Sequence, residues 1–321
     1  MPDFLRKNSL FLAPMSGVTD PAFRTICRKM GADVCVSEFV YSRAVLLRIP
    51  KILDKLRFEE SSRPYGIQLF GSDPVEVADA ASLIEELFAP DFIDLNFGCP
   101  APNAVDAGAG AALLKNPKKM AEIARTVAGK LKSVPLTAKL RTGWSHSQII
   151  VPDAALMLED SGVKLLALHG RTKTQGYSGE ADWDLINKTA SAVKIPLIGN
   201  GSVQNLSAEE LSSSPCFGFM IGRAAIGNPW VFQELKAKLN GSSYVQPGAS
   251  SRVCCAISYL EALLNNSKFA PPVDAKRNML GFLKGHAGFK KMRETIANEK
   301  LSIDLLNLLK NFKQQLDFET Q

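Results

Sequence analysis

Short apolar runs recur along the first part of the chain, and each ends in a polar or glycine-bearing turn. They read LFLAP (10–14), VCVSEF (34–39), YGIQLF (65–70), FIDLNF (92–97), LTAKLR (136–141), LLALHG (165–170), PLIGNG (196–201) and GFMIGR (218–223). Runs that are apolar almost throughout are typical of strands in a parallel sheet, because such a sheet is covered on both faces. The pattern therefore predicts eight parallel strands.

Amphipathic segments lie between these runs and predict helices. Asp20-Pro21 and Asp73-Pro74 have the acidic cap and proline that begin a helix, and Gly31 would end the first one. Pro152-Asp153 and Asp182 predict two further starts. Strands alternating with helices over ~220 residues favour a (β/α)8 TIM barrel, an α/β fold. An open doubly wound sheet is the alternative, but LFLAPMSGVTD lacks the glycine-rich fingerprint of that fold.

The pattern changes near residue 240. NGSSYVQPGASSR (240–252) has the composition of a linker. Three segments with helical apolar spacing follow, namely CCAISYLEALLNN, DAKRNMLGFLKGHAGFKKMRETIAN and KLSIDLLNLLKNFKQQL. The sequence predicts a TIM-barrel catalytic domain over residues 1–240, a linker at 241–250 and a small C-terminal helical domain at 251–321.

Composition narrows the class of protein. Hydrophobic residues make up 46% and charged residues 22%, as in soluble globular proteins, and no apolar run is long enough to span a membrane. The six cysteines show no CxxC pair or regular spacing, so we expect a reducing cytoplasm and neither a zinc site nor a disulfide framework. The net charge is +6, and 11 basic against 7 acidic residues from Ser251 onward hold most of it. This charge permits a polyanionic partner. We expect a cytoplasmic monomer.

Polar residues stand where the predicted strands end. The active site of a TIM barrel lies at the carboxyl ends of its strands, and a hydrophobic core would reject these groups. A single polar group at a strand end could simply form a structural hydrogen bond. Polar groups at the ends of most strands predict a ligand-binding site instead. They are Pro14-Met15-Ser16, Glu38, Gln68, Asn96, Cys99, Lys139, Arg141, His169, Arg171, Asn200-Gly201-Ser202 and Gly222-Arg223.

Two pairs of strand ends suggest particular ligands. Gly201 and Gly222 follow the last two strands, where barrels of this kind bind phosphate. Either glycine alone could simply form a turn at a strand end, whereas the pair favours a phosphate site. Lys139 and His169 end neighbouring strands, and a cation with an imidazole suits a flavin, whose reduced form is negative near N1.

Cys99 lies in a turn between Gly98 and Pro100. This position favours contact with a bound ligand, as a nucleophile or as a proton donor. The following stretch, Ala107–Ala112, has very small side chains, which either leave a cavity or let the backbone approach one.

These motifs together resemble the dihydrouridine synthase family, and most closely its bacterial B-type enzymes. The blocks are LAPMSGVTDPAFR, GADVCVSEF, IQLFGSDP, IDLNFGCP, GAGAALLKNP, AKLRTGW, HGRTKTQGYSGEADW, IPLIGNGSV and MIGRAAIGNPWVF. The family consists of FMN-dependent oxidoreductases that reduce specific uridines of tRNA to 5,6-dihydrouridine with NADPH as reductant. The resemblance implies that the helical tail binds tRNA.

The resemblance also implies roles for individual residues. Cys99 would give a proton to uracil C5 while the reduced flavin delivers a hydride from N5 to C6. Substrate contacts would come from Asn96, Arg141, Arg171 and Tyr177. The FMN ligands would be Pro14, Met15 and Ser16 beneath the ring, Gln68, Lys139 and His169 around it, and Asn200, Gly201, Ser202, Gly222 and Arg223 at its phosphate.

The chain departs from the family pattern at three places. Asn103 and Asp106 stand where family members have lysines, and Ser202 stands where the phosphate step usually has aspartate. In the tail, the arginine of the family's R-K-H-x-x-W-Y block is present as Arg277, followed by NMLGFL. Losing two cations weakens attraction for phosphate. Three alternatives to tRNA reduction therefore stay open: a small-molecule FMN enzyme of dihydroorotate-dehydrogenase type, dihydrouridine synthesis in rRNA, and a non-catalytic RNA binder.

Overall fold

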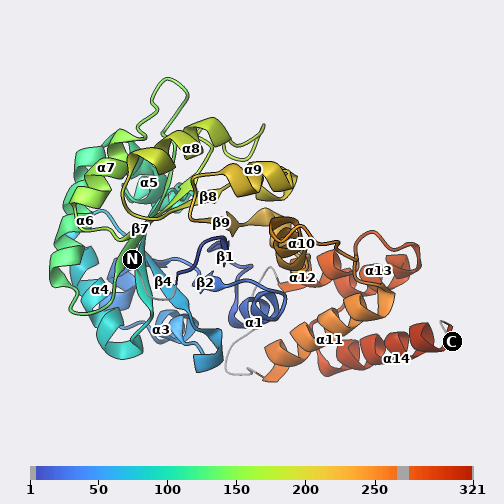
Figure 1. Ribbon diagram of the computed structural model, residues 1–321. Helices are drawn as coiled ribbons and strands as arrows, with labels where there is room; N and C mark the ends of the chain where they lie inside the picture. Colours follow the sequence, from blue (N-terminus) through green and yellow to red (C-terminus); the bar gives the residue numbers. More distant parts are fainter. Residues whose placement is uncertain (1–4, 266–274, 320–321) are drawn as a thin grey trace. The chain divides into compact units, whose positions relative to one another are not determined.

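The computed structural model describes residues 5–265 and 275–319, and its strands close into a barrel (Figure 1). Each strand pairs in parallel with the next one around the ring, and β9 returns to β1. This closure confirms the predicted TIM barrel and excludes the open sheet. The eight strands of the ring are β1 (Ser9–Leu12), β2 (Val34–Val36), β4 (Tyr65–Phe70), β5 (Phe92–Phe97), β6 (Leu136–Arg141), β7 (Leu165–His169), β8 (Leu197–Asn200) and β9 (Gly218–Ile221).

Every predicted apolar run overlaps one of these strands, and β4, β5 and β6 have the predicted bounds. The other five strands end one to three residues earlier than predicted, because the last residues of those runs leave the ladder. One strand was missed: β3 (Val40–Tyr41), which pairs with the end of β4. Two residues are too few to give a recognisable pattern.

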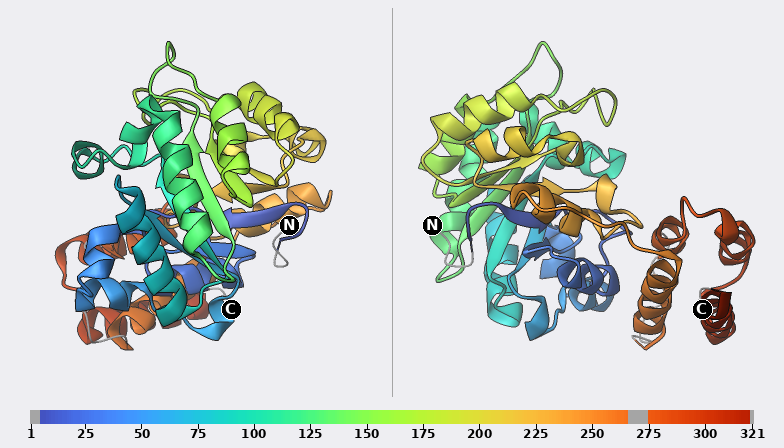
Figure 2. Two further views of the ribbon diagram at one scale, coloured as in Figure 1. Left: turned by 90° about the vertical axis from the view of Figure 1, so that its left-hand side faces the viewer. Right: turned by 45° about the vertical axis from the view of Figure 1, so that its right-hand side comes forward.

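Helices fill the connections, and the predicted caps are confirmed. The carboxylates of Asp20, Asp73 and Asp182 each accept a hydrogen bond from the backbone N–H three residues later. In chain order, the helices between residues 21 and 239 are α1 (Pro21–Lys29), α2 (Ser42–Leu46), α3 (Pro50–Leu56), α4 (Pro74–Phe88), α5 (Pro102–Asp106), α6 (Pro117–Lys130), α7 (Asp153–Asp160), α8 (Trp183–Ala192), α9 (Ala208–Ser213) and α10 (Val231–Leu239), with short 3-10 turns η1 (Glu60–Ser62), η2 (Gly110–Lys115), η3 (Val203–Asn205) and η4 (Arg223–Ala225). Among them, α4, α6 and α7 follow one another around the outside of the strands (Figures 1 and 2).

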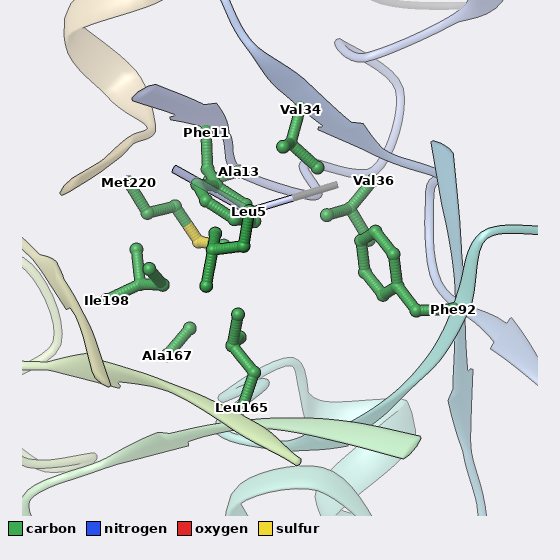
Figure 3. Close-up of a cluster of buried hydrophobic side chains, with 10 residues drawn as sticks. All are labelled: Leu5, Phe11, Ala13, Val34, Val36, Phe92, Leu165, Ala167, Ile198 and Met220. Carbon is green, nitrogen blue, oxygen red and sulfur yellow. The ribbon is translucent and has the colours of Figure 1, made fainter. Parts of the chain in front are cut away.

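Leu5 lies at the centre of a cluster of buried apolar side chains inside the barrel (Figure 3). The other members come from strands all around the ring, including Phe11, Val36, Phe92, Ile198 and Met220. Burying one such side chain stabilises the fold by about 2 kcal/mol. This cluster makes the barrel interior a packed core, so a ligand must bind at its end.

The chain divides into two compact units. The first comprises the described residues of Met1–Pro14 with Ala32–Gly222, and it holds all the strands. The second comprises Met15–Gly31, which contains α1, with the described residues of Arg223–Gln321. The predicted domain limits at 240 and 251 remain a prediction, and these units have different bounds.

The second unit has its own core. Tyr259 donates a hydrogen bond of 2.6 Å from its hydroxyl to Asp20, and Asn278 donates to the backbone oxygen of Val18 at 3.1 Å. The rings of Phe23 and Tyr259 meet edge to face at 6.3 Å. These contacts join α1 to the C-terminal helices, which explains why a segment near the N-terminus belongs to this unit.

The C-terminal segments are helical, as predicted from their spacing. They form α11 (Ala249–Asn265), α12 (Ala275–Phe282), η5 (Ala287–Phe289), α13 (Lys290–Asn298) and α14 (Ile303–Glu319), and α11 packs beside α14 (Figure 1). The middle segment divides at Gly285, whose φ of +86° does not fit a helix. Across the described ranges, none of the helices has the length and apolarity needed to cross a membrane.

Candidate active site at the carboxyl ends of the strands

A chain of buried side-chain hydrogen bonds connects three neighbouring strands. The Asp94 carboxylate accepts from the Thr137 hydroxyl at 2.5 Å and from the Gln68 amide at 2.6 Å. The Gln68 amide oxygen in turn accepts from Asn96 Nδ2 at 2.8 Å. Since each amide has one donor end and one acceptor end, Asp94 fixes the orientation of Gln68, and Gln68 fixes that of Asn96.

The Asn96 end of this series of hydrogen bonds holds the backbone of Cys99. Asn96 Oδ1 accepts from the N–H groups of Gly98 at 3.0 Å and Cys99 at 2.8 Å. Arg141 Nε donates to the Gly98 carbonyl oxygen at 2.9 Å. Both edges of the turn are therefore bonded to side chains from the strand ends, and the cysteine has a fixed position.

The glycine-alanine stretch packs against the same turn. Ala111 N–H donates to the Cys99 carbonyl at 2.9 Å, and a Cβ placed on Gly110 would lie 2.9 Å from that oxygen. Gly110 also has a φ of +56°. Gly110 therefore lets two stretches of backbone approach each other closely, and the predicted cavity beside the small residues stays a prediction.

Burial sets the acidity of the Cys99 thiol. Removal from water raises its pKa, while a backbone hydrogen bond and the charges of Arg141 and Lys139 oppose that shift. The thiol therefore keeps its proton at neutral pH. This state suits a proton donor better than a thiolate nucleophile.

Lys139 points toward the end of the neighbouring strand. Its ammonium donates to Asn200 Oδ1 at 3.1 Å, and Asn200 Nδ2 donates to the Met220 carbonyl at 2.7 Å. Burial, and next the charge of Arg141, lowers the pKa of Lys139 to about 8. An anion beside this ammonium would restore its preference for the charged form.

His169 and Arg171 form a second group with the loop after β8. Arg171 lies 3.2 Å from His169 Nε2 and donates to the Ser202 hydroxyl at 2.9 Å. Because a guanidinium only donates, His169 Nε2 acts as the acceptor, and we infer a neutral ring with its proton on Nδ1. Arg171 also donates to the carbonyl of Gly179 at 2.6 Å and so holds its own loop.

The backbone after β8 has the conformation of an anion cradle. Gly201 has a φ of +107°, and a Cβ there would lie 2.8 Å from the His169 ring. Ser202 also has a positive φ, +51°. Within residues 5–265 and 275–319, the N–H groups of Gly201 and Ser202 have no protein acceptor. Successive unpaired N–H groups in such a turn bind anions such as phosphate.

Arg141 and Tyr177 stand at the outer side of this region. Arg141 NH1 donates to the carbonyls of Thr172 at 3.0 Å and Gly176 at 2.9 Å, and its guanidinium lies 5.5 Å from the Tyr177 ring centroid. Arg141 is buried, whereas Tyr177 is 52% exposed. Of these two predicted substrate contacts, Tyr177 is the accessible one, and Arg141 holds the β7 loop in place.

The structure thus brings together most of the predicted site within the first unit. Gln68, Asn96 and Cys99 form one group, Lys139 and Asn200 a second, and His169, Arg171, Gly201 and Ser202 a third. Pro14 and Gly222 end the two segments of this unit. Met15, Ser16 and Arg223 belong to the second unit, where Ser16 and Arg223 are exposed, and their roles stay predictions.

Sequence reasoning missed Asp94 and Thr137. Asp94 is only 4% exposed, and burial raises the pKa of its carboxyl. The signal was present, since an acidic residue inside the otherwise apolar run FIDLNF requires buried partners.

The residues present fit a flavin that ends in phosphate. The fit rests on the unpaired N–H groups of Gly201 and Ser202 and on the ammonium of Lys139 nearby along the strand ends. In the part of the chain that the structure describes, no group of three His, Cys, Asp or Glu side chains could hold a metal ion.

Fold and site together define a (β/α)8-barrel protein with a polar ligand site at the carboxyl ends of its strands. A model of the family described as "Dihydrouridine synthase (Dus)" matches residues 11–317. The chain belongs to the dihydrouridine synthase family.

Individual relatives are similar over nearly their whole length. The probable tRNA-dihydrouridine synthase of Rickettsia conorii is 35% identical, with 95% of this chain and 97% of the relative covered. The probable tRNA-dihydrouridine synthase of Aquifex aeolicus is 33% identical, with 97% of this chain and 98% of the relative covered. tRNA-dihydrouridine synthase B of Vibrio vulnificus is 36% identical, with 90% of each chain covered. The resemblance read from the motifs is confirmed.

Proposed function

We propose that this protein reduces uridines of tRNA to 5,6-dihydrouridine, with FMN as cofactor and NAD(P)H as reductant. Membership of the dihydrouridine synthase family supports this proposal, as do relatives named for tRNA. The observation that supports the chemistry best is the fixed, protonated Cys99 at the end of the Asp94–Gln68–Asn96 hydrogen-bond chain.

The chain's own residues would hold the cofactor at the strand ends. Gly201 and Ser202 would bind its phosphate through their unpaired N–H groups, and Lys139 would place a positive charge beside its ring system. Gln68 and His169 would complete the contacts, and Asn200 would orient Lys139. When bound and reduced by NAD(P)H, FMN would supply the hydride that uracil C6 accepts.

Cys99 would supply the other hydrogen. Its S–H bond breaks as the proton passes to uracil C5, the C5–C6 double bond becomes single, and the thiolate later takes a proton from water. The charges of Arg141 and Lys139 stabilise the thiolate while it lasts. Burial keeps the proton on the sulfur until the proton passes to uracil C5.

Small residues would allow the uracil to reach this point. The reacting ring must leave the RNA stack, as in other enzymes that act on a base. Gly110 keeps the turn around Cys99 compact, because a Cβ there would lie 2.9 Å from the Cys99 carbonyl oxygen. The exposed ring of Tyr177 would stack with a displaced base.

The test is a reaction with the purified full chain, FMN, NADPH and a tRNA transcript that contains no modified bases. We expect dihydrouridine at defined positions, detected by mass spectrometry as the gain of two hydrogens. A parallel reaction with rRNA and one with orotate separate the alternative substrates. Reduction of orotate without any dihydrouridine in RNA would overturn the proposal in favour of a small-molecule enzyme.

A further inference from the structure

Three loops at the carboxyl ends of the strands each contribute one residue to a cluster of two lysines around a tryptophan. Lys115 ends η2 after β5, Trp144 follows β6, and Lys173 follows β7. The ammonium of Lys115 lies 3.7 Å from the Trp144 ring centroid, and that of Lys173 lies 4.4 Å from it. We call these residues the Lys115–Trp144–Lys173 cluster.

Hydrogen bonds fix the main chain at the tryptophan. Lys173 N–H donates to the Gly143 carbonyl at 3.0 Å, and Thr174 N–H donates to the Trp144 carbonyl at 2.9 Å. Trp144 N–H itself donates to the Gln148 carbonyl at 3.2 Å. The loops after β6 and β7 are thus joined at two successive residues, Gly143 and Trp144, and this joining places Lys173 beside the tryptophan.

The cluster has positive charge without a matching carboxylate. Within the described ranges, neither Lys115 nor Lys173 forms an ion pair. Their ammonium groups are no more than about 8 Å apart, because both lie within 4.4 Å of one centroid. Two like charges at this separation repel each other, and the ring quadrupole offsets this only in part. An anion between or beside them would be favoured.

The same loops lead directly to the candidate active site. η2 is bonded to Cys99 through Ala111 N–H, and Arg141 at the end of β6 donates to the carbonyls of Gly98 and Thr172. The loop that contains Lys173 also contains Tyr177. A ligand whose reacting part lies at Cys99 and which extends outward over these loops would meet the cluster.

We propose that the Lys115–Trp144–Lys173 cluster binds phosphate groups of the RNA substrate and positions the strand beside Cys99. This inference rests on the proposed function. The cluster supplies two cations on the rim where Asn103 and Asp106 supply none, so the positive charge of the cluster comes from the loops after β5 and β7. Both ammonium groups lie against the same ring, which lowers the entropy cost of binding a phosphate.

The test compares binding of an unmodified tRNA transcript by the full chain and by the double variant Lys115→Ala/Lys173→Ala. Dissociation constants are measured across a salt series. We expect the double variant to bind about 10-fold more weakly near 0.15 M salt, with the slope of log K against log[salt] smaller by about 1.5, because two phosphate contacts are lost. Trp144→Leu keeps both charges, so its loss should be smaller, about 3-fold.

Two controls separate this cluster from general effects. Lys164→Ala removes an exposed lysine next to the amino end of β7 and should leave the affinity and slope unchanged. Lys115→Arg/Lys173→Arg keeps both charges and should bind like the unaltered protein. The KM for NADPH, which also has phosphates, should be the same in all variants.

The outcomes distinguish this inference from the function itself. If the unaltered protein forms dihydrouridine but the double variant keeps its affinity and salt slope, the cluster does not bind RNA. A raised KM for NADPH with normal tRNA affinity would assign the cluster to the reductant and overturn the inference. If the unaltered protein neither binds nor reduces RNA, the proposed function fails and this inference with it.

Discussion

The interior of the candidate site is held by buried hydrogen bonds, whereas its rim carries exposed side chains. The interior, comprising Asp94, Gln68, Asn96 and Cys99, is joined by hydrogen bonds that leave each amide one orientation. On the rim, Asn103 and Asp106 are exposed on the short helix α5. A change in the interior leaves a buried group without a partner, whereas a change on the rim affects only solvated charge.

This difference explains which family features the chain keeps. Cys99, the proposed proton donor, and the residues that hold its turn are present, while the lysines expected at positions 103 and 106 are replaced. The interior would determine the chemistry and the rim would determine the affinity for RNA. Four substitutions test this division, and the expected effects decrease in order.

Cys99→Ala should have the largest effect. Without the thiol proton, uridine reduction should slow by ~10²-fold or more, while tRNA affinity and cofactor binding stay unchanged. Single-turnover formation of dihydrouridine measures the rate, and Cys254→Ala, which alters a partly buried cysteine of the second unit, is the matched control. A normal rate for Cys99→Ala would show that another group donates the proton.

Asn96→Ala should be next. It removes the acceptor of the Gly98 and Cys99 N–H groups and the donor to Gln68, so we expect a loss of about 1–3 kcal/mol in the free energy of unfolding and about 10-fold slower reduction. Urea denaturation measures the stability. The comparison is Asn103→Ala, an exposed asparagine whose side-chain oxygen accepts from the next residue's N–H, and this variant should change stability by less than about 0.5 kcal/mol. Equal losses would contradict the division between interior and rim.

The pH dependence of FMN affinity tests Lys139. The lowered pKa, about 8, means that the amine is charged below that pH and neutral above it. If the charge attracts the flavin, affinity should fall as pH rises, by about 10-fold between pH 7 and pH 9. Fluorescence titration measures it. Lys139→Met should bind FMN weakly with no such dependence, and an identical pH profile in both proteins would exclude this role.

Asn103→Lys/Asp106→Lys should have the smallest effect. Two cations on exposed positions should tighten tRNA binding by about 3-fold and steepen its salt dependence, while the rate of a bound substrate stays the same. Dissociation constants of tRNA measured at two salt concentrations are sufficient to detect both changes. No change in affinity or slope would mean that α5 does not face RNA phosphate.

Much of the fold could be predicted from the sequence because the local signals are strong. The run LTAKLR is apolar enough to mark β6, and Asp73-Pro74 marks the start of α4. The grouping of α1 with the C-terminal helices could not be predicted, because the Asp20–Tyr259 hydrogen bond joins residues 239 positions apart. No local pattern contains such a contact.

The candidate site was only partly predictable for a related reason. Strand ends identify Gln68, Asn96 and Lys139 because polar groups there are conspicuous. The orientation of the amides depends on Asp94 and Thr137, which come from neighbouring strands and whose pairing requires the register of the barrel. The Lys115–Trp144–Lys173 cluster likewise combines three loops, and each of its residues alone would be an ordinary surface residue.

If this chain acts as proposed, dihydrouridine in tRNA depends on it and on Cys99. The most direct measurement is a map of dihydrouridine in tRNA and rRNA from cells with the gene intact, deleted, and deleted but supplied with either the unaltered or the Cys99→Ala protein. We expect that at least one tRNA position loses dihydrouridine on deletion and regains it with the unaltered protein but not with Cys99→Ala. Unchanged dihydrouridine at every tRNA position after deletion would contradict it.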